Sequence, residues 1–253
     1  MDRYMLECCV DSVESAIEAE KGGADRLELC ANLIIGGTSP SMALFESVKR
    51  NVSIPIFPLL RPRFGDFLYS DYEFEILKEE VRMFREAGAD GVVIGCLKAD
   101  GTLDVAKMKE LILEAGDMHV TLHRAFDMTK DPVSTLKEAK ELGIKTILTS
   151  GQKNSALEGK ELIKNLIKEA GEDIEILIGS GVNADVIKIF LDESDAYAFH
   201  MSGKETLESK MTYRKEGVSM GLPMMSEYEI WQTNSLNLKN AKDIINKKRL
   251  GNL

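Results

Sequence analysis

The stretch YMLECCVDSVESAIEAEKGGADRLELC, residues 4–30, decides the fold. It opens with a short apolar run suited to a β-strand, continues with helical spacing from about Ser12, and ends in a second β-rich run at residues 26–30. Glycine readily adopts the left-handed conformation that ends a helix, so Gly22 and Gly23 mark a turn from helix to strand. The stretch therefore predicts one strand–helix–strand unit with parallel strands.

The same unit repeats along the chain. Glycine turns recur before the β-rich runs at residues 91–96 and 146–149, and apolar residues at helical spacing occupy residues 72–87 and 155–170. Eight strands are predicted, at residues 4–9, 26–30, 54–60, 91–96, 120–123, 146–149, 174–179 and 196–201. Eight uninterrupted units favour an α/β fold of the closed, parallel (β/α)8 type, the TIM barrel. An open doubly wound sheet is the alternative, but its Gly-x-Gly-x-x-Gly fingerprint does not follow the first strand.

The length of 253 residues fits one such barrel, which typically has about 250 residues. From residue 203 onward the pattern changes to a loop-like segment at 217–223 and a helical tail near 238–247. We therefore predict a single domain over residues 1–253, with the barrel at 4–202. The C-terminal extension at 203–253 is predicted to be a cap or an oligomer contact, so a homo-oligomer is expected.

Charge and composition limit the classes of partner that the chain can bind. A net charge of -10 repels phosphate backbones and anionic lipids, which argues against nucleic-acid and membrane-surface partners. No stretch approaches the roughly 20 apolar residues of a membrane-spanning helix, and the first residues show no apolar leader. These features predict a cytoplasmic protein whose four cysteines are free thiols.

The first two strands place ionisable residues inside the predicted barrel. With period two, Glu7 and Cys9 share one face of the first strand, and Arg26, Glu28 and Cys30 share one face of the second. The leucines of the second strand take the other face, which suits helix packing, so the polar set points inward. A buried charge costs several kcal/mol unless it is paired. The set therefore predicts either a structural ion-pair network or a ligand pocket.

Further polar residues follow the other strands, at the carboxyl-terminal mouth where barrels of this type carry their active sites. They are Arg61 and Arg63 after the third strand, His123, Arg124 and Asp127 after the fifth, Ser180 and Gly181 after the seventh, and His200 in the eighth. Guanidinium groups and a glycine turn before a helix suit a small carboxylated or phosphorylated ligand. The candidate acid/base residues are Glu7, Glu28, His123, Asp127 and His200.

For the two histidines and for the glycine turn, structural roles remain open as alternatives. No lysine falls at the carboxyl end of a predicted strand, which disfavours Schiff-base chemistry.

Cys9 and Cys30 end neighbouring strands on the inward side, and two thiolates suit the soft ion Cu(I). The alternative is that both cysteines are small buried hydrophobic residues.

Several motifs together resemble the CutC copper-homeostasis family over about residues 4–202. They are Glu7-x-Cys9, Gly23-Ala24-Asp25-Arg26-Leu27-Glu28-Leu29-Cys30, Gly36-Gly37-Thr38-x-Pro40, Arg61-Pro62-Arg63-x-Gly65-Asp66-Phe67-x-Tyr69, His123-Arg124-Ala125-Phe126-Asp127 and Thr149-Ser150-Gly151. The resemblance implies a cytoplasmic TIM-type barrel linked to copper tolerance, with Cu(I) ligands at Cys9 and Cys30. The C-terminal tail matches the family only loosely.

Two hypotheses follow. The first is a copper-homeostasis protein that holds Cu(I) between Cys9 and Cys30. The second is an enzyme that acts by acid/base chemistry on a small anionic metabolite, because the polar mouth is richer than a site with two thiols requires.

Overall fold

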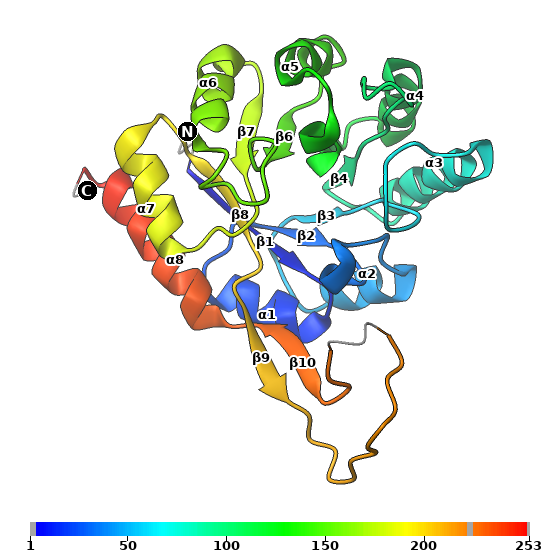
Figure 1. Cartoon of the computed structure of the whole chain (residues 1–253), viewed down its shortest axis with the longest axis vertical. Coiled ribbons are helices and arrows are strands. Elements are labelled where there is room, and N and C mark those ends of the chain that lie inside the picture. The colour runs from blue at the N-terminus through cyan, green and yellow to red at the C-terminus, as the bar shows by residue number, and fades with distance from the viewer. Residues whose placement is uncertain (1–3, 222–224, 252–253) are drawn as a thin grey trace.

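The structure is a computed structural model that describes residues 4–221 and 225–251. Its main sheet has eight parallel strands in the order β3-β2-β1-β8-β7-β6-β5-β4, with helices around the outside (Figure 1). A parallel bridge between Leu59 and Val93 joins the two edge strands, β3 and β4, and closes the sheet. The predicted (β/α)8 barrel is confirmed.

The bounds of the elements follow the sequence prediction closely. The strands are β1 Met5–Val10, β2 Arg26–Leu29, β3 Ile56–Pro58, β4 Gly91–Ile94, β5 His119–Leu122, β6 Thr146–Thr149, β7 Glu175–Ile178, β8 Ala198–Met201, β9 Lys204–Glu208 and β10 Glu229–Thr233. The α-helices are α1 Val13–Lys21, α2 Met42–Lys49, α3 Asp71–Glu86, α4 Val105–Ala115, α5 Pro132–Glu141, α6 Lys160–Ala170, α7 Ala184–Glu193 and α8 Ser235–Arg249. Short 3₁₀ turns are η1 Leu33–Ile35 and η2 Arg124–Met128.

Local sequence sets where the helices begin. The side chain of Ser12 accepts a hydrogen bond from the N–H of Ser15 and caps α1, and Asp131 caps α5 in the same way. Helix α6, which was predicted to begin at Ser155, begins five residues later, at Lys160. The backbones of Gly151 and Gly159 lie so close that a Cβ on Gly159 would approach the carbonyl oxygen of Ser150 to 2.0 Å. This contact keeps the residues between Ser155 and Gly159 in turns.

The alternation of side chains across the strands separates two kinds of core. Leu6, Cys8 and Val10 of β1 belong to the main hydrophobic cluster between the sheet and the helices. Inside the barrel, two smaller apolar clusters remain, one formed by Cys30, Phe57, Leu59 and Val93 and the other by Leu148, Leu177 and Ala198. The predicted inward face of the first two strands is therefore correct.

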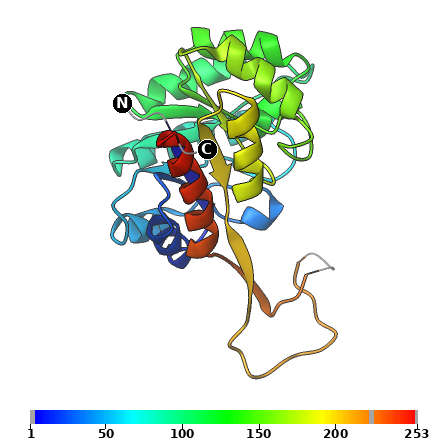
Figure 2. The ribbon, with the colours of Figure 1, turned by 90° about the vertical axis from the view of Figure 1, so that its left-hand side faces the viewer.

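The C-terminal region has two parts. Strands β9 and β10 pair antiparallel, and the hairpin projects away from the barrel (Figure 2). Helix α8 then returns to pack beside α7 and α1, and it buries Leu238, Ala241 and Ile245 in the main core. The prediction ended the barrel near residue 202, but the helix that completes the outer ring comes from beyond it. None of the helices within the described residues is long and apolar enough to cross a membrane.

Candidate functional site

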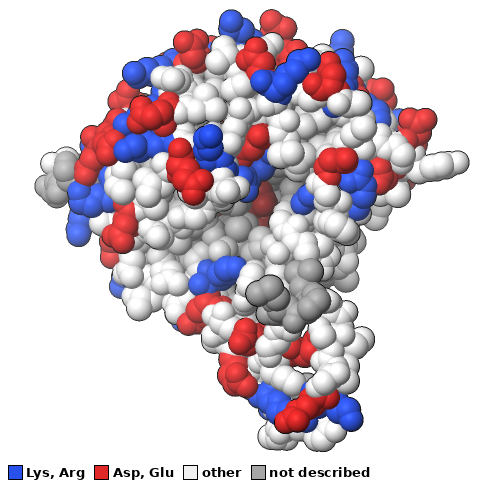
Figure 3. Space-filling view, in the orientation of Figure 1, with Lys and Arg blue, Asp and Glu red and all other residues white. Residues whose placement is uncertain are grey.

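A cavity of about 730 Å³ opens at the carboxyl ends of the barrel strands. The face drawn in Figure 3 is hollowed near its centre, with charged side chains around the hollow. Nine of the predicted site residues line the cavity: Cys9, Glu28, Arg61, His123, Arg124, Asp127, Ser180, Gly181 and His200. Glu7, Arg63 and Cys30 do not line it.

Glu7 lies below the cavity floor and is fully buried. One carboxylate oxygen lies 2.7 Å from Nδ1 of His200, and the other accepts a hydrogen bond of 2.5 Å from Nε of Arg26. Burial alone raises the pKa of Glu7, but Arg26 and the hydrogen bond from His200 outweigh it and hold the pKa at about 2. Glu7 is therefore ionised and fully engaged, and it does not exchange protons near neutral pH.

The contacts of Glu7 continue across the barrel interior. Nη2 of Arg26 lies 3.3 Å from the carboxylate of Glu175, which accepts a hydrogen bond of 3.0 Å from Thr146. The Thr146 hydroxyl in turn lies 2.8 Å from Nε2 of His119. We call this chain the interior network; its members are His200, Glu7, Arg26, Glu175, Thr146 and His119. The last three were not predicted, although Glu175 shares the inward face of β7 with Leu177.

Glu28 behaves differently from Glu7, although both point inward. Its Oε2 atom is buried and has no hydrogen-bond partner among the described residues. Burial raises the pKa of Glu28 to about 7; His200 and Arg26 oppose this shift, and the charge of Glu7 adds to it. A carboxyl group with such a pKa exchanges its proton near neutral pH, and the acid/base role of Glu28 stays a prediction.

His123 follows β5 at the cavity wall. Its Nδ1 accepts a hydrogen bond of 3.1 Å from the N–H of Ala125, so the proton of the neutral ring is on Nε2. That Nε2 atom is buried and has no partner within the described residues. Burial and the charge of Arg61 lower the pKa of His123 to about 3. His123 thus offers a neutral N–H donor, rather than the proton exchange near pH 7 expected from its sequence.

Arg61 joins two loops beside the cavity. Its guanidinium donates to the carbonyl oxygens of Gly36 and Gly37, at 3.3 and 3.2 Å, and to that of Gly65, at 2.6 Å. Its Nε is buried and unpartnered, and no carboxylate of the described chain lies within 4.0 Å of it. The positive charge of Arg61 is therefore not neutralised by the protein, which suits the binding of an anion.

Asp127 was predicted to be catalytic, but its carboxylate is occupied by the loop after β6. It accepts hydrogen bonds from the Thr149 hydroxyl, at 2.5 Å, and from the N–H groups of Ser150 and Gln152. Nε of Arg124 donates to the same carboxylate at 2.8 Å. These contacts assign Asp127 to holding the loop in place, and they use one edge of the Arg124 guanidinium.

Arg63 was predicted to bind an anion, but it lies outside the cavity. It donates to Glu73 at 2.6 Å and to Asp66 at 3.0 Å, and thus ties together the loop after β3. The sequence pattern does not separate it from Arg61, because both follow the same strand. The difference comes from the loop, which turns the second arginine toward α3.

The turn after β7 leaves main-chain donors at the cavity edge. Ser180 and Gly181 adopt positive φ angles of 76° and 71°, and the Ser180 hydroxyl donates to the carbonyl oxygen of Asn154. In the described part of the chain, the N–H groups of Gly181 and Val182 have no acceptor. Helix α7 begins directly after this turn, so its amino terminus adds a favourable field for an anion.

The two predicted copper ligands have unequal exposure. Cys9 lines the cavity, whereas Cys30 is fully buried beside Phe57 and Leu59, with its sulfur 3.6 Å from the carbonyl oxygen of Val10. Burial and the charge of Glu28 raise the pKa of Cys30 well above its usual range. Two sulfur donors on the inward face of neighbouring strands, with apolar surroundings at Cys30, fit a soft ion such as Cu(I).

Lys204 also lines the cavity, and it was not among the residues predicted from the sequence. It begins β9, three residues after the end of β8, in a segment that was assigned to the extension. Burial lowers its pKa. Lys204 lies beyond the end of the predicted eighth strand, and it reaches the cavity because the hairpin starts at the cavity rim.

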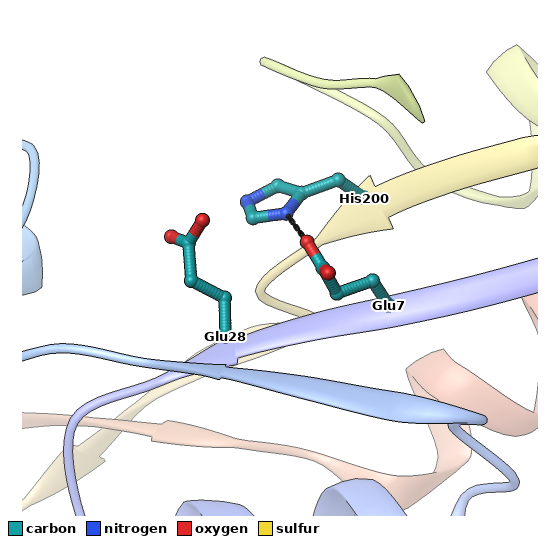
Figure 4. A group of neighbouring side chains, drawn as sticks. All are labelled: Glu7, Glu28 and His200. Carbon is teal, nitrogen blue, oxygen red and sulfur yellow. Dashed lines mark hydrogen bonds and ion pairs between the residues drawn. The ribbon is translucent and has the colours of Figure 1, made fainter. Parts of the chain in front are cut away.

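Three side chains at and below the cavity floor also satisfy the spacing of a metal site. Among the described residues, Glu7, Glu28 and His200 form the one group of three whose ligand atoms all lie within 4.8 Å of one another. All three are buried. Figure 4 shows the Glu28 carboxylate on the side of the His200 ring that faces away from Glu7.

Comparisons with known proteins agree with this fold and with the motifs. The sequence model of the CutC family matches residues 4–205. A human protein named copper homeostasis protein cutC homolog is 46% identical over 228 residues, which cover 90% of this chain and 84% of the human protein. A CutC family protein from Pasteurella multocida is 38% identical and covers 96% of this chain and 99% of its own.

Solved structures give the same picture. The copper homeostasis protein CutC from Streptococcus agalactiae superposes with a TM-score of 0.75 at 28% identity, over 79% of this chain and 98% of that protein. Thiamine phosphate pyrophosphorylase from Pyrococcus furiosus superposes with a TM-score of 0.58 at 14% identity, over 97% of each chain. At that identity the second likeness concerns the fold alone.

Proposed function

The chain belongs to the CutC family, and on that premise we propose that it serves copper homeostasis by binding Cu(I) through Cys9 and Cys30. The observation that carries the proposal is the placement of both cysteines on the inward side of neighbouring strands, where the Cα of Cys9 pairs with Glu28, two residues before Cys30. The names of the human and Streptococcus agalactiae relatives support a role in copper homeostasis.

The chemistry of the two sulfurs supports Cu(I) over harder ions. Cu(I) prefers thiolate ligands and tolerates low coordination numbers, so two cysteines, one of them in apolar surroundings, satisfy it. All four cysteines are free, which agrees with the reducing cytoplasm as the compartment that we propose. Assembly into a homo-oligomer through residues 203–253 belongs to the same proposal.

An anaerobic competition titration against a coloured Cu(I) chelator tests the proposal. We expect one Cu(I) per wild-type chain, at least tenfold weaker binding in Cys9→Ser and Cys30→Ser, and loss of binding in the double variant. Cys96→Ser is the matched control, because Cys96 is also fully buried but belongs to the main core between sheet and helices. Unchanged affinity in the double variant would overturn the proposal.

A second candidate function is an enzyme that acts on a small anionic metabolite. A specific observation favours it: Glu28 Oε2, Arg61 Nε and His123 Nε2 are all buried and unpartnered, and all three residues line one cavity. We call these three residues the mouth cluster. Native proteins leave few buried polar atoms unpaired, so three at one cavity indicate a polar ligand.

The roles in this second candidate follow from the contacts. Arg61 neutralises the anion, and the free N–H groups of Gly181 and Val182 add donors. The Nε2–H of His123 donates a hydrogen bond to an oxygen of the substrate, and Glu28 gives or takes a proton.

The test is a thermal-stability screen with phosphorylated and carboxylated metabolites. We expect at least one of them to raise the melting temperature of the wild-type protein, and Arg61→Ala to lose that shift. Arg63→Ala is the control, because it removes a guanidinium from the same loop but outside the cavity. A shift that survives Arg61→Ala but disappears with Arg63→Ala would contradict this assignment.

A further inference from the structure

We propose that Glu28 and His200 bind a divalent ion of the first transition row at the cavity floor, and that Glu7 orients His200 for this role. The site uses oxygen and nitrogen donors, so it is distinct from a Cu(I) site made of two thiols, and it does not rest on the proposed function.

The strand register brings the three residues together. Glu7 of β1 pairs with His200 of β8, and Glu28 lies on β2, which pairs with β1 on its other side. All three side chains point into the barrel, and one ligand atom from each lies within 4.8 Å of the others. Because the ligands stand on adjacent strands, the site is held by the rigid part of the barrel.

Glu7 serves the site indirectly, since its two oxygens are already engaged. One contacts Nδ1 of His200 and the other accepts from Arg26, so an ion bound directly to Glu7 would displace a buried ion pair. A carboxylate on one ring nitrogen fixes the ring and leaves the other nitrogen for a metal, an arrangement common among histidine ligands. The other ring nitrogen of His200 lies on the side of Glu28 (Figure 4), where the side chain of Cys9 also interacts with the ring.

Glu28 supplies the independent observation that a ligand belongs here. Its side chain is only 5% exposed, and Oε2 has no hydrogen-bond donor among the described residues. Arg26, the buried arginine of the interior network, is held by Glu7 and Glu175 and does not donate to Oε2 of Glu28. A buried carboxylate oxygen without a donor is costly, and a cation between Glu28 and His200 removes that cost.

The donor set selects the class of ion. Mg²⁺ and Ca²⁺ favour sites made of oxygen alone, whereas an imidazole with a carboxylate suits Zn²⁺, Mn²⁺ and related ions. Two protein ligands leave several coordination positions open toward the cavity. An anion held by Arg61 can fill them, as in metal sites that act on bound substrates.

Calorimetric titration of the metal-free protein with Zn²⁺ tests the site. We expect one Zn²⁺ per wild-type chain and no comparable binding of Mg²⁺. Binding should weaken at least tenfold in Glu28→Gln and in His200→Gln. His119→Gln is the matched control, because it removes another interior histidine, which contacts Thr146 at the start of β6. Circular dichroism identifies any variant that does not fold.

Three results would overturn the proposal. The first is Zn²⁺ affinity that is unchanged in folded Glu28→Gln and His200→Gln, and the second is tighter binding of Mg²⁺ than of Zn²⁺. The third concerns Cys30→Ser, which separates this site from the Cu(I) proposal, because Cys30 is buried in the apolar cluster with Phe57 and Leu59. This variant should keep Zn²⁺ affinity within about twofold and weaken Cu(I) binding, whereas Glu28→Gln should lose Zn²⁺ and keep Cu(I). Loss of Zn²⁺ in Cys30→Ser would sink the oxygen–nitrogen site.

Discussion

The interior network and the mouth cluster lie in the same barrel, but they differ in whether their buried polar groups have partners. In the network, Glu7, Arg26 and Glu175 are joined by ion pairs of 2.5 and 3.3 Å. In the mouth cluster, Glu28, Arg61 and His123 each keep a buried polar atom that has no hydrogen-bond partner in the described part of the chain. The charges of the network therefore compensate one another inside the barrel, whereas the mouth cluster keeps buried polar atoms that the described chain does not satisfy.

Two glutamates make the contrast plain. Glu7 has Arg26 beside it and a pKa of about 2, whereas burial raises the pKa of Glu28 to about 7. They stand on neighbouring strands and share the inward face. The position of a glutamate on the inward face therefore does not determine its pKa. The presence of a charged partner does.

The largest expected effect comes from breaking the network. Glu7→Ala leaves the guanidinium of Arg26 buried without its closest counter-charge, so the free energy of unfolding should fall by about 3–5 kcal/mol. Urea denaturation followed by circular dichroism measures it. Glu80→Ala is the control, since it removes a half-buried carboxylate whose one hydrogen bond among the described residues comes from Ser39. A loss below about 1 kcal/mol for Glu7→Ala would show that the network does not stabilise the barrel.

A smaller loss in the free energy of unfolding is expected at Asp127. This residue lines the cavity, but its carboxylate is paired, as are the charges of the interior network. Asp127→Asn replaces an acceptor of several hydrogen bonds with a group that also donates, and should cost about 2–3 kcal/mol. The same denaturation experiment applies. Asp66→Asn is the control, because the Asp66 side chain is 68% exposed and should change stability little. Equal losses of stability in the two variants would show that the contacts of Asp127 do not hold the loop after β6 in place.

Glu28→Gln should raise the free energy of unfolding rather than lower it, because the carboxylate of Glu28 is unpaired. The pKa is raised from 4.5 to about 7 on folding, so its contribution to stability is present below pH 4.5 and is lost as pH rises through 7. Removing the charge should stabilise the metal-free protein by about 1–3 kcal/mol at pH 8 and by little at pH 5. Melting curves at both values measure this. A variant less stable than wild type at pH 8 would mean that the carboxylate has a partner.

The smallest effect is expected at Arg63, whose partners lie near the surface. Its side chain is 34% exposed and pairs with Glu73 and Asp66, so Arg63→Ala should cost about 0–1 kcal/mol. It should leave ligand and metal binding unchanged. A loss of cavity binding in this variant would place Arg63 with the mouth cluster.

Most of the fold and the identity of many site residues could be predicted from the sequence. Strand and helix periods are local properties, so the eight units and the inward face of Glu7, Cys9 and Glu28 follow from spacing alone. The structure departs where distant segments meet. The close approach of Gly151 and Gly159 delays α6, and Lys204 reaches the cavity from a segment predicted to lie outside the barrel.

That charged residues point into a barrel and gather at its mouth follows from the sequence, because alternation along a strand requires nothing beyond the strand. Which of these charges are paired depends on contacts between distant segments. Arg26 meets Glu175 across 149 positions of chain, and Asp127 meets the loop after β6 across 22 or more. Such contacts exist only once the sheet closes. The closed sheet therefore determines that Glu7 is paired and that Glu28 is not.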